Sequence, residues 1–317
     1  RANRRYRRRR CRDRMTQDSI KADWIAVDWG TSSLRIWAMQ DRTIVAQAKS
    51  DHGMANMTPD AYETVLREVA GPMLADELPI IICGMAGARQ GWIEAAYRPV
   101  PASPMDVSLG VQPDAGGLNV VILNGMSQND PPDVMRGEET QIAGVLLQEP
   151  KFDGVICLPG THTKWARISA EEVCHFMTAM TGEIFALLSE KSVLRHGLPV
   201  SGHVDTAFLE AVDAAYTRPQ RIASQLFGIR AAGLLAETDP AAARSRLSGY
   251  LIGMELAAAK PYWLGAHVAL VGPEEMCDRY LAALESLGAS ATKRDATDAT
   301  LDGLYSARLQ ILGNHRP

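Results

Sequence analysis

Two short glycine turns rich in hydroxyl groups carry the residue types that bind phosphate. The first, Asp28-Trp29-Gly30-Thr31-Ser32-Ser33, follows the apolar run Ile25-Ala26-Val27, and the second, Pro159-Gly160-Thr161-His162-Thr163-Lys164, follows Val155-Ile156-Cys157-Leu158. Glycine lets the backbone approach a ligand closely, and hydroxyl and free N–H groups can donate to phosphate oxygens. Each turn alone could be an ordinary hairpin with a polar turn, but two such loops can hold one phosphate chain from both sides.

Asp28 stands at the end of the first apolar run, where its carboxylate can serve a cation. Mg²⁺ usually takes one or two carboxylates together with phosphate oxygens and waters, so the first turn predicts a Mg-nucleotide site with Asp28 as its protein ligand. His162 could be a metal ligand or a general base. We expect no acidic partner beside it, so we assign it to the second phosphate loop or to a structural role.

Other candidates for chemistry lie in two connecting segments. Glu138 and Glu139 follow a proline-rich turn and stand next to Arg136 and Gly137 at the start of a predicted helix. Capping of the helix by one acid would explain one of them, and a site would explain both. The connection from Gly84 to Ser103 follows the carboxyl end of a predicted strand, where open α/β sheets bind ligands. It provides three candidate substrate contacts, Arg89, Gln90 and Trp92, with a plain surface loop as the alternative.

The elements that position these residues alternate between strands and helices. Trp24–Met39 is predicted to form a hairpin, Thr43–Lys49 a third strand, and Pro59–Leu74 a helix with Thr58 as its N-cap. Further strands are predicted at Pro79–Cys83 and Asn119–Leu123, and the segment SQNDPPD is expected to be a polar turn before the helix that bears Glu138. This succession of elements indicates an α/β sheet.

The second half of the chain repeats the opening pattern. Strands are expected at Gly154–Leu158, Trp165–Ile168 and Cys174–Met177, and Met180-Thr181-Gly182-Glu183 is expected to open a helix. Residues 205–260 read as almost entirely helical, with breaks at Pro219, Gly228 and Asp239-Pro240, and their Ala and Leu stripes are expected to form core contacts. The remaining predicted elements are a strand at Val268–Val271, a helix at Glu275–Leu287 and a final amphipathic helix.

Composition places the chain among ordinary globular proteins. It has 317 residues, 46% of them hydrophobic and 22% charged, and a formal net charge of −4. Residues 1–14 contain nine arginines and one aspartate, so the rest of the chain, with 24 basic and 36 acidic residues, has a charge near −12. An acidic body disfavours a nucleic-acid partner. The arginine-rich start predicts a disordered and dispensable tail ahead of a natural start at Met15, and RNA or membrane-surface binding by this tail is the alternative.

Cysteine spacing and hydropathy set further limits. The five cysteines are scattered and form no C-x-x-C pair, which disfavours structural zinc and favours free thiols. No apolar run approaches the ~20 residues that cross a bilayer, and we expect a cytoplasmic protein without a membrane partner. The sequence contains no G-x-x-x-x-G-K-[ST] motif, no glycine-rich loop of protein kinases, and no G-x-G-x-x-G after the first strand. P-loop enzymes, protein kinases and Rossmann dehydrogenases are therefore disfavoured.

The order of five motifs resembles the 2-keto-3-deoxygalactonate kinases, also called 2-dehydro-3-deoxygalactonokinases. These motifs are D-W-G-T-S-S-L-R, G-M-x-G-x-R-Q-G-W, V-M-R-G-E-E-T-Q, L-P-G-T-H-T-K-W and M-T-G-E, and the resemblance covers roughly residues 23–312. It implies the two-domain α/β fold of actin-like ATPases and sugar kinases, with a helical insertion in the second domain. We expect a tail at residues 1–22, a first domain at 23–148 and a second at 149–317, whose last helix packs back on the first.

The resemblance also implies an activity, cofactors and a set of site residues. The reaction would be transfer of the γ-phosphate of ATP, with Mg²⁺, to the C6 hydroxyl of 2-keto-3-deoxygalactonate in galactonate or galactose breakdown. Nucleotide-binding residues would be Gly30, Thr31, Ser32 and Ser33 in the first loop, Gly160, Thr161, His162, Thr163 and Lys164 in the second, and Gly272 and Pro273 beside the nucleoside. Related chains tend to carry A-G-T-S where this one has V-G-P-E-E, and this departure leaves the nucleoside contacts, including the role of Glu274, open.

The remaining roles concern the sugar acid and the proton. Asp28 would carry the metal, Glu138 is our choice for the general base and Glu139 the alternative, and the substrate contacts would be Arg89, Gln90, Trp92, Arg136, Thr181 and Glu183. The arginines favour an acidic substrate, because a guanidinium binds a carboxylate through two parallel bonds. Two alternatives remain open, a kinase for another small sugar acid and a non-catalytic nucleotide-binding sensor of the same fold. A homo-oligomer also remains open.

Overall fold

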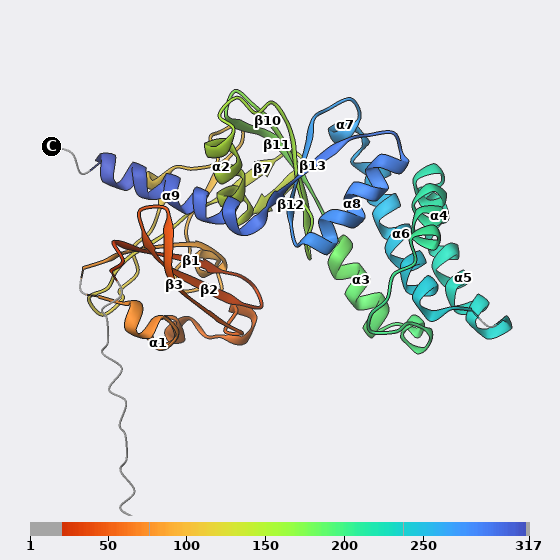
Figure 1. The fold of residues 1–317 in the computed structure, drawn as a ribbon, viewed down its shortest axis with the longest axis horizontal. Coiled ribbons are helices and arrows are strands. Elements are labelled where there is room, and N and C mark those ends of the chain that lie inside the picture. Colours follow the sequence, from red (N-terminus) through yellow and green to blue (C-terminus); the bar gives the residue numbers. More distant parts are fainter. Residues whose placement is uncertain (1–20, 76, 237, 315–317) are drawn as a thin grey trace, which may run out of the picture.

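Two five-stranded sheets repeat one strand order along the chain (Figure 1). The structure is a computed structural model that describes residues 21–75, 77–236 and 238–314, so the arginine-rich start lies outside the described residues. The sheets have the orders β3-β2-β1-β4-β6 and β11-β10-β9-β12-β13. In each sheet three antiparallel strands precede two parallel ones. The expected actin-like α/β fold is confirmed.

The first sheet is buried on both faces. Its strands are β1 (Trp24–Trp29), β2 (Leu34–Gln40), β3 (Thr43–Ser50), β4 (Pro79–Gly84) and β6 (Asn119–Ile122). Ile25, Val27 and Trp29 pack toward helix α1 (Tyr62–Ala70), whereas Trp24 and Ala26 pack toward helix α9 (Ala296–Asn314). Successive side chains of a strand point to opposite faces, so a continuous apolar run such as that of β1 requires cover on both sides. We call residues 21–75 and 77–124 the first lobe.

The first helix is shorter than the sequence predicts. Short 3₁₀ turns, Pro59–Ala61 and Gly71–Met73, flank α1, and Thr58 makes no side-chain capping bond to the turn that it precedes. Gly71 has a φ of +46°, and Pro72 follows it. A positive φ and a proline both end an α-helix, which explains the early stop.

The segment expected to be a polar turn is a hairpin instead. Strands β7 (Gly125–Asn129) and β8 (Pro132–Met135) pair with each other, and β7 also pairs with β5 (Tyr97–Pro99). The Phe176 N–H donates to Gln128 Oε1 at 2.9 Å, and the Thr178 N–H donates to Asp133 Oδ2 at 2.7 Å. These bonds attach the small sheet to edge strand β11, so Asp133 has a structural role.

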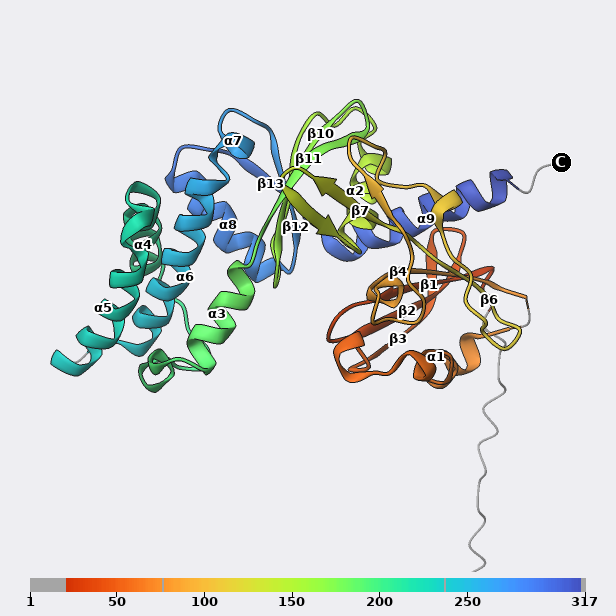
Figure 2. The ribbon, with the colours of Figure 1, turned by 180° about the vertical axis from the view of Figure 1, so that it is seen from behind.

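The second sheet is accompanied by helices that gather at one end of the molecule (Figure 2). Its strands are β9 (Gly154–Leu158), β10 (Thr163–Ser169), β11 (Glu172–Ala179), β12 (Val268–Gly272) and β13 (Ala291–Asp295). The helices are α3 (Thr181–Glu190), α4 (Asp205–Thr217), α5 (Ile222–Leu235), α6 (Pro240–Ala258), α7 (Lys260–Trp263) and α8 (Glu274–Ser286). We call residues 149–236 and 238–295 the second lobe.

The break expected at Gly228 is wrong, because α5 continues through this residue. A Cβ at Gly228 would meet no described atom within 4 Å, so the position faces open space. A single exposed glycine lowers helix stability by only about 1 kcal/mol, and neighbouring residues can override it.

Helices α2 (Glu138–Gln148) and α9 connect the two lobes. Ile142 and Val145 of α2 belong to the core of the second sheet, while Ala143 packs in the core beside the first sheet. Figure 1 shows α9 running from the second sheet across the first lobe, where Leu301 and Leu304 are buried.

The domain boundary at residue 148 stays a prediction. Among the described residues, no helix is both long and apolar enough to span a membrane.

Candidate active site

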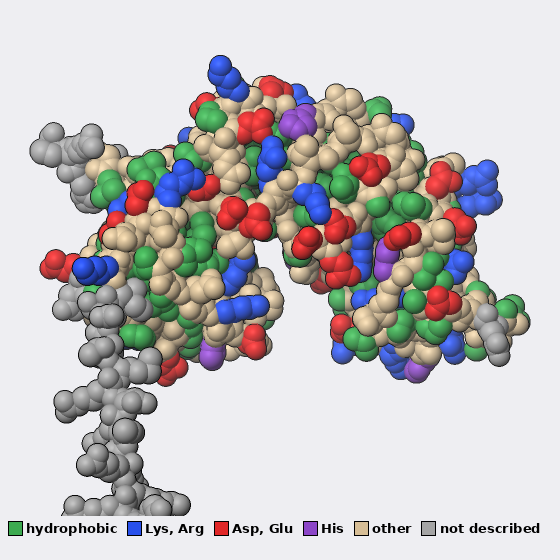
Figure 3. All heavy atoms as spheres, in the orientation of Figure 1, with side chains coloured by type: hydrophobic (Ala, Val, Ile, Leu, Met, Phe, Trp, Pro, Cys, Tyr) green, Lys and Arg blue, Asp and Glu red, His purple; other side chains and the backbone are tan. Residues whose placement is uncertain are grey.

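A cavity of about 890 Å³ lies between the lobes and collects most of the predicted phosphate-binding residues. The space-filling view is hollowed between the first lobe and the helices of the second (Figure 3). Its walls include Asp28, Gly30, Thr31, Arg35, Arg136, Gly137, Glu138, Gln141, Gly160, Thr161, His162, Lys164, Gly272, Pro273, Glu274, Asp295, Thr297 and Thr300. The two lobes thus share one candidate ligand site.

The end of β1 brings Asp28 to the cavity, and the turn between β1 and β2 brings Gly30 and Thr31. The Gly30 N–H donates to the Ser33 carbonyl at 2.8 Å, which closes the turn. Asp28 lies opposite Arg35 across the hairpin and forms an ion pair with it. Ser32 and Ser33 belong to the same turn but lie outside the cavity lining.

The turn between β9 and β10 is held against the start of α3. A Cβ on Gly182 would lie 2.3 Å from the Gly160 carbonyl oxygen, so only glycine permits this approach. The Glu183 N–H also donates to the Thr161 carbonyl at 3.0 Å. Thr163 is fully buried below the turn, and its Oγ1 lies 3.0 Å from the Tyr280 hydroxyl. Thr163 therefore faces the core rather than the cavity.

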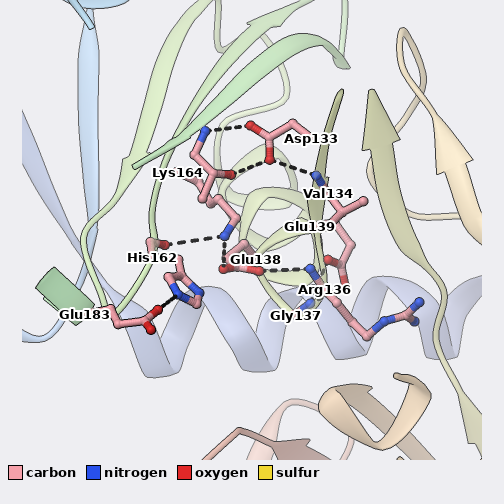
Figure 4. Close-up of polar contacts among 10 residues, drawn as sticks. Asp133, Val134, Arg136, Gly137, Glu138, Glu139, His162, Lys164 and Glu183 are labelled. Atoms are coloured by element: carbon pink, nitrogen blue, oxygen red, sulfur yellow. Dashed lines mark hydrogen bonds and ion pairs between the residues drawn. The ribbon is translucent and has the colours of Figure 1, made fainter. Parts of the chain in front are cut away.

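Lys164 and Glu138 meet across the cavity (Figure 4). The Lys164 Nζ lies 3.1 Å from Glu138 Oε1, and Lys164 has an exposed fraction of only 4%. The other oxygen of Glu138 accepts the Arg136 backbone N–H at 3.0 Å. A buried cation of the second lobe and a carboxylate at the start of α2, 25% exposed, thus form an ion pair on the cavity wall.

Glu139 lies beneath the cavity wall. Its carboxylate accepts the Gly137 N–H at 2.7 Å, and its exposed fraction is 1%. Burial raises the pKa of Glu139 to about 7, and the neighbouring Glu138 charge adds to the effect. Of the two candidate bases, Glu138 is the one that can meet a ligand in the cavity.

His162 has an acidic partner, contrary to our expectation. The His162 Nε2 lies 2.6 Å from Glu183 Oε2, and both side chains are partly exposed (Figure 4). The sequence conceals this pair because its members are 21 residues apart and are joined only by the packing of α3 on the loop. Glu183, a predicted substrate contact, thus pairs with a histidine of the turn between β9 and β10.

Arg136 is buried and only partly satisfied. Its Nη2 donates to the Ala95 carbonyl at 2.8 Å, and the guanidinium lies 4.2 Å from the centre of the Tyr97 ring. Nε and Nη1 have no hydrogen-bond partner among the described residues. In Figure 4 the guanidinium points away from Glu138 and Lys164.

The other predicted substrate contacts lie outside the cavity lining. The Arg89 side chain is 81% exposed, with Glu94 at 3.9 Å, and Gln90 is also exposed. Trp92 packs in the core of the first lobe, with its ring 5.9 Å from Tyr62 and 6.4 Å from Trp29. Thr181 is buried and donates to Glu255. The roles assigned to these four residues stay predictions.

Sequence reasoning missed two groups near the site. Asp295, Thr297 and Thr300 line the cavity where β13 meets α9, and β13 escaped prediction because its sequence, ATKRD, is mostly polar. Glu255 was missed because the Ala and Leu residues around it on α6 predict only core contacts. Its carboxylate is buried and bonds to Trp165, just after the turn between β9 and β10. A charged residue at an otherwise apolar helix position was the signal available.

Comparisons with known proteins agree with the geometry. Residues 28–307 match the family described as 2-keto-3-deoxy-galactonokinase. The chain is 39% identical over 295 residues to a probable 2-dehydro-3-deoxygalactonokinase of Rhizobium meliloti, covering 89% of this chain and 95% of the relative. It is 33% identical over 280 residues to the 2-dehydro-3-deoxygalactonokinase of Escherichia coli, covering 87% and 94%. A crystal structure described as a 2-dehydro-3-deoxygalactonokinase protein from Sinorhizobium meliloti has a TM-score of 0.85 at 38% identity, covering 91% and 99%.

Proposed function

The chain belongs to the 2-keto-3-deoxy-galactonokinase family, and we propose that it phosphorylates the C6 hydroxyl of 2-keto-3-deoxygalactonate in galactonate or galactose breakdown. It is a phosphotransferase with an alcohol acceptor, and as a kinase of this family it uses ATP. The observation that carries the proposal is the shared cavity, in which two Gly-Thr turns from different lobes face the Lys164–Glu138 pair.

The turns supply the phosphate-binding groups in this proposal. Gly30 and Thr31 offer backbone N–H and hydroxyl donors from the first lobe, and Gly160 and Thr161 offer them from the second. Lys164 adds a positive charge at the same wall. Phosphoryl transfer depends mainly on positioning and on neutralising charge, which these groups provide without covalent chemistry.

Asp28 fits the requirement of Mg²⁺. Its carboxylate lines the cavity, and its pairing with Arg35 through Oδ2 leaves the other oxygen outside that pair. The described residues contain no group of three or more His, Cys, Asp or Glu side chains arranged to hold a metal. Mg²⁺ needs no such group, because it is commonly bound by one or two carboxylates and phosphate oxygens. When bound, the cation would neutralise charge on the transferred phosphoryl group.

Glu138 is the proposed general base. It faces the cavity, whereas Glu139 does not, and it forms an ion pair with Lys164. A phosphate group that attracts Lys164 would compete with Glu138 for the lysine ammonium group, leaving the carboxylate available to accept the hydroxyl proton.

Arg136 is the proposed contact for the substrate carboxylate, since two of its nitrogens have no partner among the described residues. Both atoms are buried, so this contact requires the side chain to turn toward the cavity.

An ADP-release assay with a substrate panel tests the proposal. We expect turnover of 2-keto-3-deoxygalactonate with ATP and Mg²⁺, much poorer kcat/KM for neutral sugars such as glucose and glycerol, and a phosphate on C6 of the product by ³¹P and ¹³C NMR. Glu138→Gln should lower kcat by roughly 10²–10⁴ while ATP still binds, because loss of a general base typically has this effect. Glu139→Gln is the matched control, with a change in kcat of less than about tenfold.

Three results would contradict parts of the proposal. Comparable kcat/KM for a neutral sugar would exclude specificity for a sugar acid. A phosphate on another carbon would exclude C6 as the acceptor. A Glu138→Gln enzyme with near-normal kcat would remove Glu138 as the base.

A further inference from the structure

We infer that Glu255 is a positioning residue that holds the second phosphate loop and the start of α3 in the geometry required for the nucleotide. The inference rests on the proposed function only in taking Gly160–Lys164 as a phosphate loop. Glu255 lies on α6, within the helical part of the second lobe, and is 3% exposed. It does not line the cavity, so it acts through its neighbours.

Three different elements donate hydrogen bonds to this single carboxylate. Trp165 of β10 donates its Nε1–H to Glu255 Oε1 at 2.7 Å. The Tyr280 hydroxyl of α8 donates to Oε2 at 2.8 Å, and the Thr181 hydroxyl at the start of α3 donates to the same oxygen. Because a carboxylate only accepts, it can gather donors from β10, α8 and α3 around one point.

Each donor is connected to the second phosphate loop. Trp165 directly follows Lys164, and Tyr280 also contacts Thr163 Oγ1 at 3.0 Å. Thr181 precedes Gly182, which packs against Gly160, and Glu183, which pairs with His162 at 2.6 Å. A shift of Glu255 would therefore reach Thr163 and Lys164 on one side of the loop and His162 on the other.

Burying a carboxylate at this position costs desolvation free energy, which indicates that Glu255 has a role beyond packing. Burial raises the pKa of Glu255, so desolvation opposes its charged form there. Neighbouring buried positions of α6 are apolar or small, for example Leu251, Ile252 and Leu256. Buried polar networks that are fully satisfied fix one arrangement of the groups around them, whereas apolar contacts allow several. Here the fixed groups are those that meet phosphate.

A loop that is held in advance loses less conformational entropy when it binds. Loss of the Glu255 contacts should therefore weaken nucleotide binding. The sugar acid should be affected less, because its proposed contact, Arg136, bonds to Ala95 and stacks on Tyr97, away from this network.

The test compares Glu255→Gln with Ser245→Ala. Glutamine keeps the size of glutamate but presents an N–H₂ group toward groups that are themselves donors. Ser245 is a matched control on the same helix, 1% exposed, whose Oγ bonds at 2.8 Å to Val204 N and to the Ala241 carbonyl, far from the loop in the hydrogen-bond network. For each protein we would measure the Kd of ADP by calorimetry, KM for ATP and for 2-keto-3-deoxygalactonate, and Tm.

For Glu255→Gln we expect the Kd of ADP and KM for ATP to rise at least tenfold, while KM for the sugar acid changes by less than about threefold. Ser245→Ala should lower Tm with Kd and both KM values unchanged. If Glu255→Gln lowers Tm but leaves the Kd of ADP unchanged, Glu255 is purely structural and the inference is overturned. Equal losses of nucleotide and sugar-acid binding would also overturn it.

Tyr280→Phe decides the matter if Glu255→Gln does not fold. This change removes only the hydroxyl that joins Glu255 to Thr163, and we expect the Kd of ADP to rise about threefold or more. An unchanged Kd would refute the connection. Because ADP binding needs no sugar acid, weaker ADP binding together with no turnover of 2-keto-3-deoxygalactonate by the wild type would support this inference and reject the proposed substrate.

Discussion

Glu138 and Glu139 are neighbours in sequence, but their side chains lie in different environments. Glu138 faces the cavity and is paired with Lys164, whereas Glu139 is enclosed beside Gly137 and Thr140. Successive residues of a helix point about 100° apart, so one wall can expose one of two adjacent carboxylates and bury the other. The sequence could place two acids at the helix start, but the burial of Glu139 depends on packing that only the tertiary structure specifies.

The raised pKa of Glu139 predicts a pH-dependent free energy of unfolding. Below the ordinary pKa of 4.5 the carboxyl is protonated in both states, and as the pH rises to about 7 the unfolded state releases a proton that the folded state retains. The stabilisation is therefore complete below pH 4.5 and is lost as the pH rises through about 7, by roughly 3 kcal/mol. Glu139→Gln cannot ionise and should lack this component.

Urea unfolding of both proteins between pH 4.5 and 8 would measure the effect. The other ionisable groups are present in both proteins, and their contributions largely cancel in the difference. We expect the variant to gain stability relative to the wild type across this range. A constant difference would show that Glu139 titrates normally in the folded protein.

Among the elements, apolar strands were predictable and polar ones were not. The β1–β2 and β9–β10 hairpins could be predicted because continuous apolar runs end in glycine turns. Strands β8 and β13, with sequences PDVM and ATKRD, carry no such run. The pairing of β8 with β7 depends on the geometry of the turn between them, and the pairing of β13 with β12 depends on a partner distant in sequence. The His162–Glu183 and Glu255 contacts were unpredictable for the same reason, since each joins different elements.

The crossing of α2 and α9 depends on two glycines. A Cβ on Gly144 would lie 1.8 Å from the Ala299 carbonyl oxygen, and one on Gly303 would lie 1.9 Å from that of Thr140. Both neighbours are backbone atoms, which cannot rotate away. The two helices therefore approach one another at a distance that no larger residue allows.

Gly144→Ala should destabilise the protein by ~1–3 kcal/mol, the usual cost of overpacking a close contact. Gly313→Ala is the matched control on α9, because its Cβ would meet no described atom within 4 Å. Alanine favours helix by up to ~1 kcal/mol over glycine, so the control should be neutral or stabilising. Urea unfolding of the two variants measures both effects, and equal stability of the two would contradict the close crossing.

At the scale of the whole molecule, the site is divided between two bodies. Asp28, Gly30 and Thr31 belong to the first lobe, and Gly160, Thr161 and Lys164 belong to the second, while α2 and α9 connect the lobes. The repeated strand order explains how the sequence could predict this division, because two similar hairpins, each with a Gly-Thr turn, open the two halves. The width of the cavity was not predictable, since it depends on how α2 and α9 set the lobes against each other.

A ligand that contacts both lobes should bind best when they are close together. Such a ligand shifts the population toward the closed arrangement by as much as its affinities for the two arrangements differ. We therefore expect a non-hydrolysable ATP analogue with Mg²⁺ and the sugar acid to reduce the radius of gyration measured by small-angle X-ray scattering. Lys164→Met, which removes the cation of the second loop, should show a smaller reduction at the same ligand concentrations. Identical scattering of the free and fully liganded wild type would contradict this expectation and show that the lobes do not move together on binding. The volume of the site with ligands bound would then equal that of the cavity between the lobes, about 890 Å³.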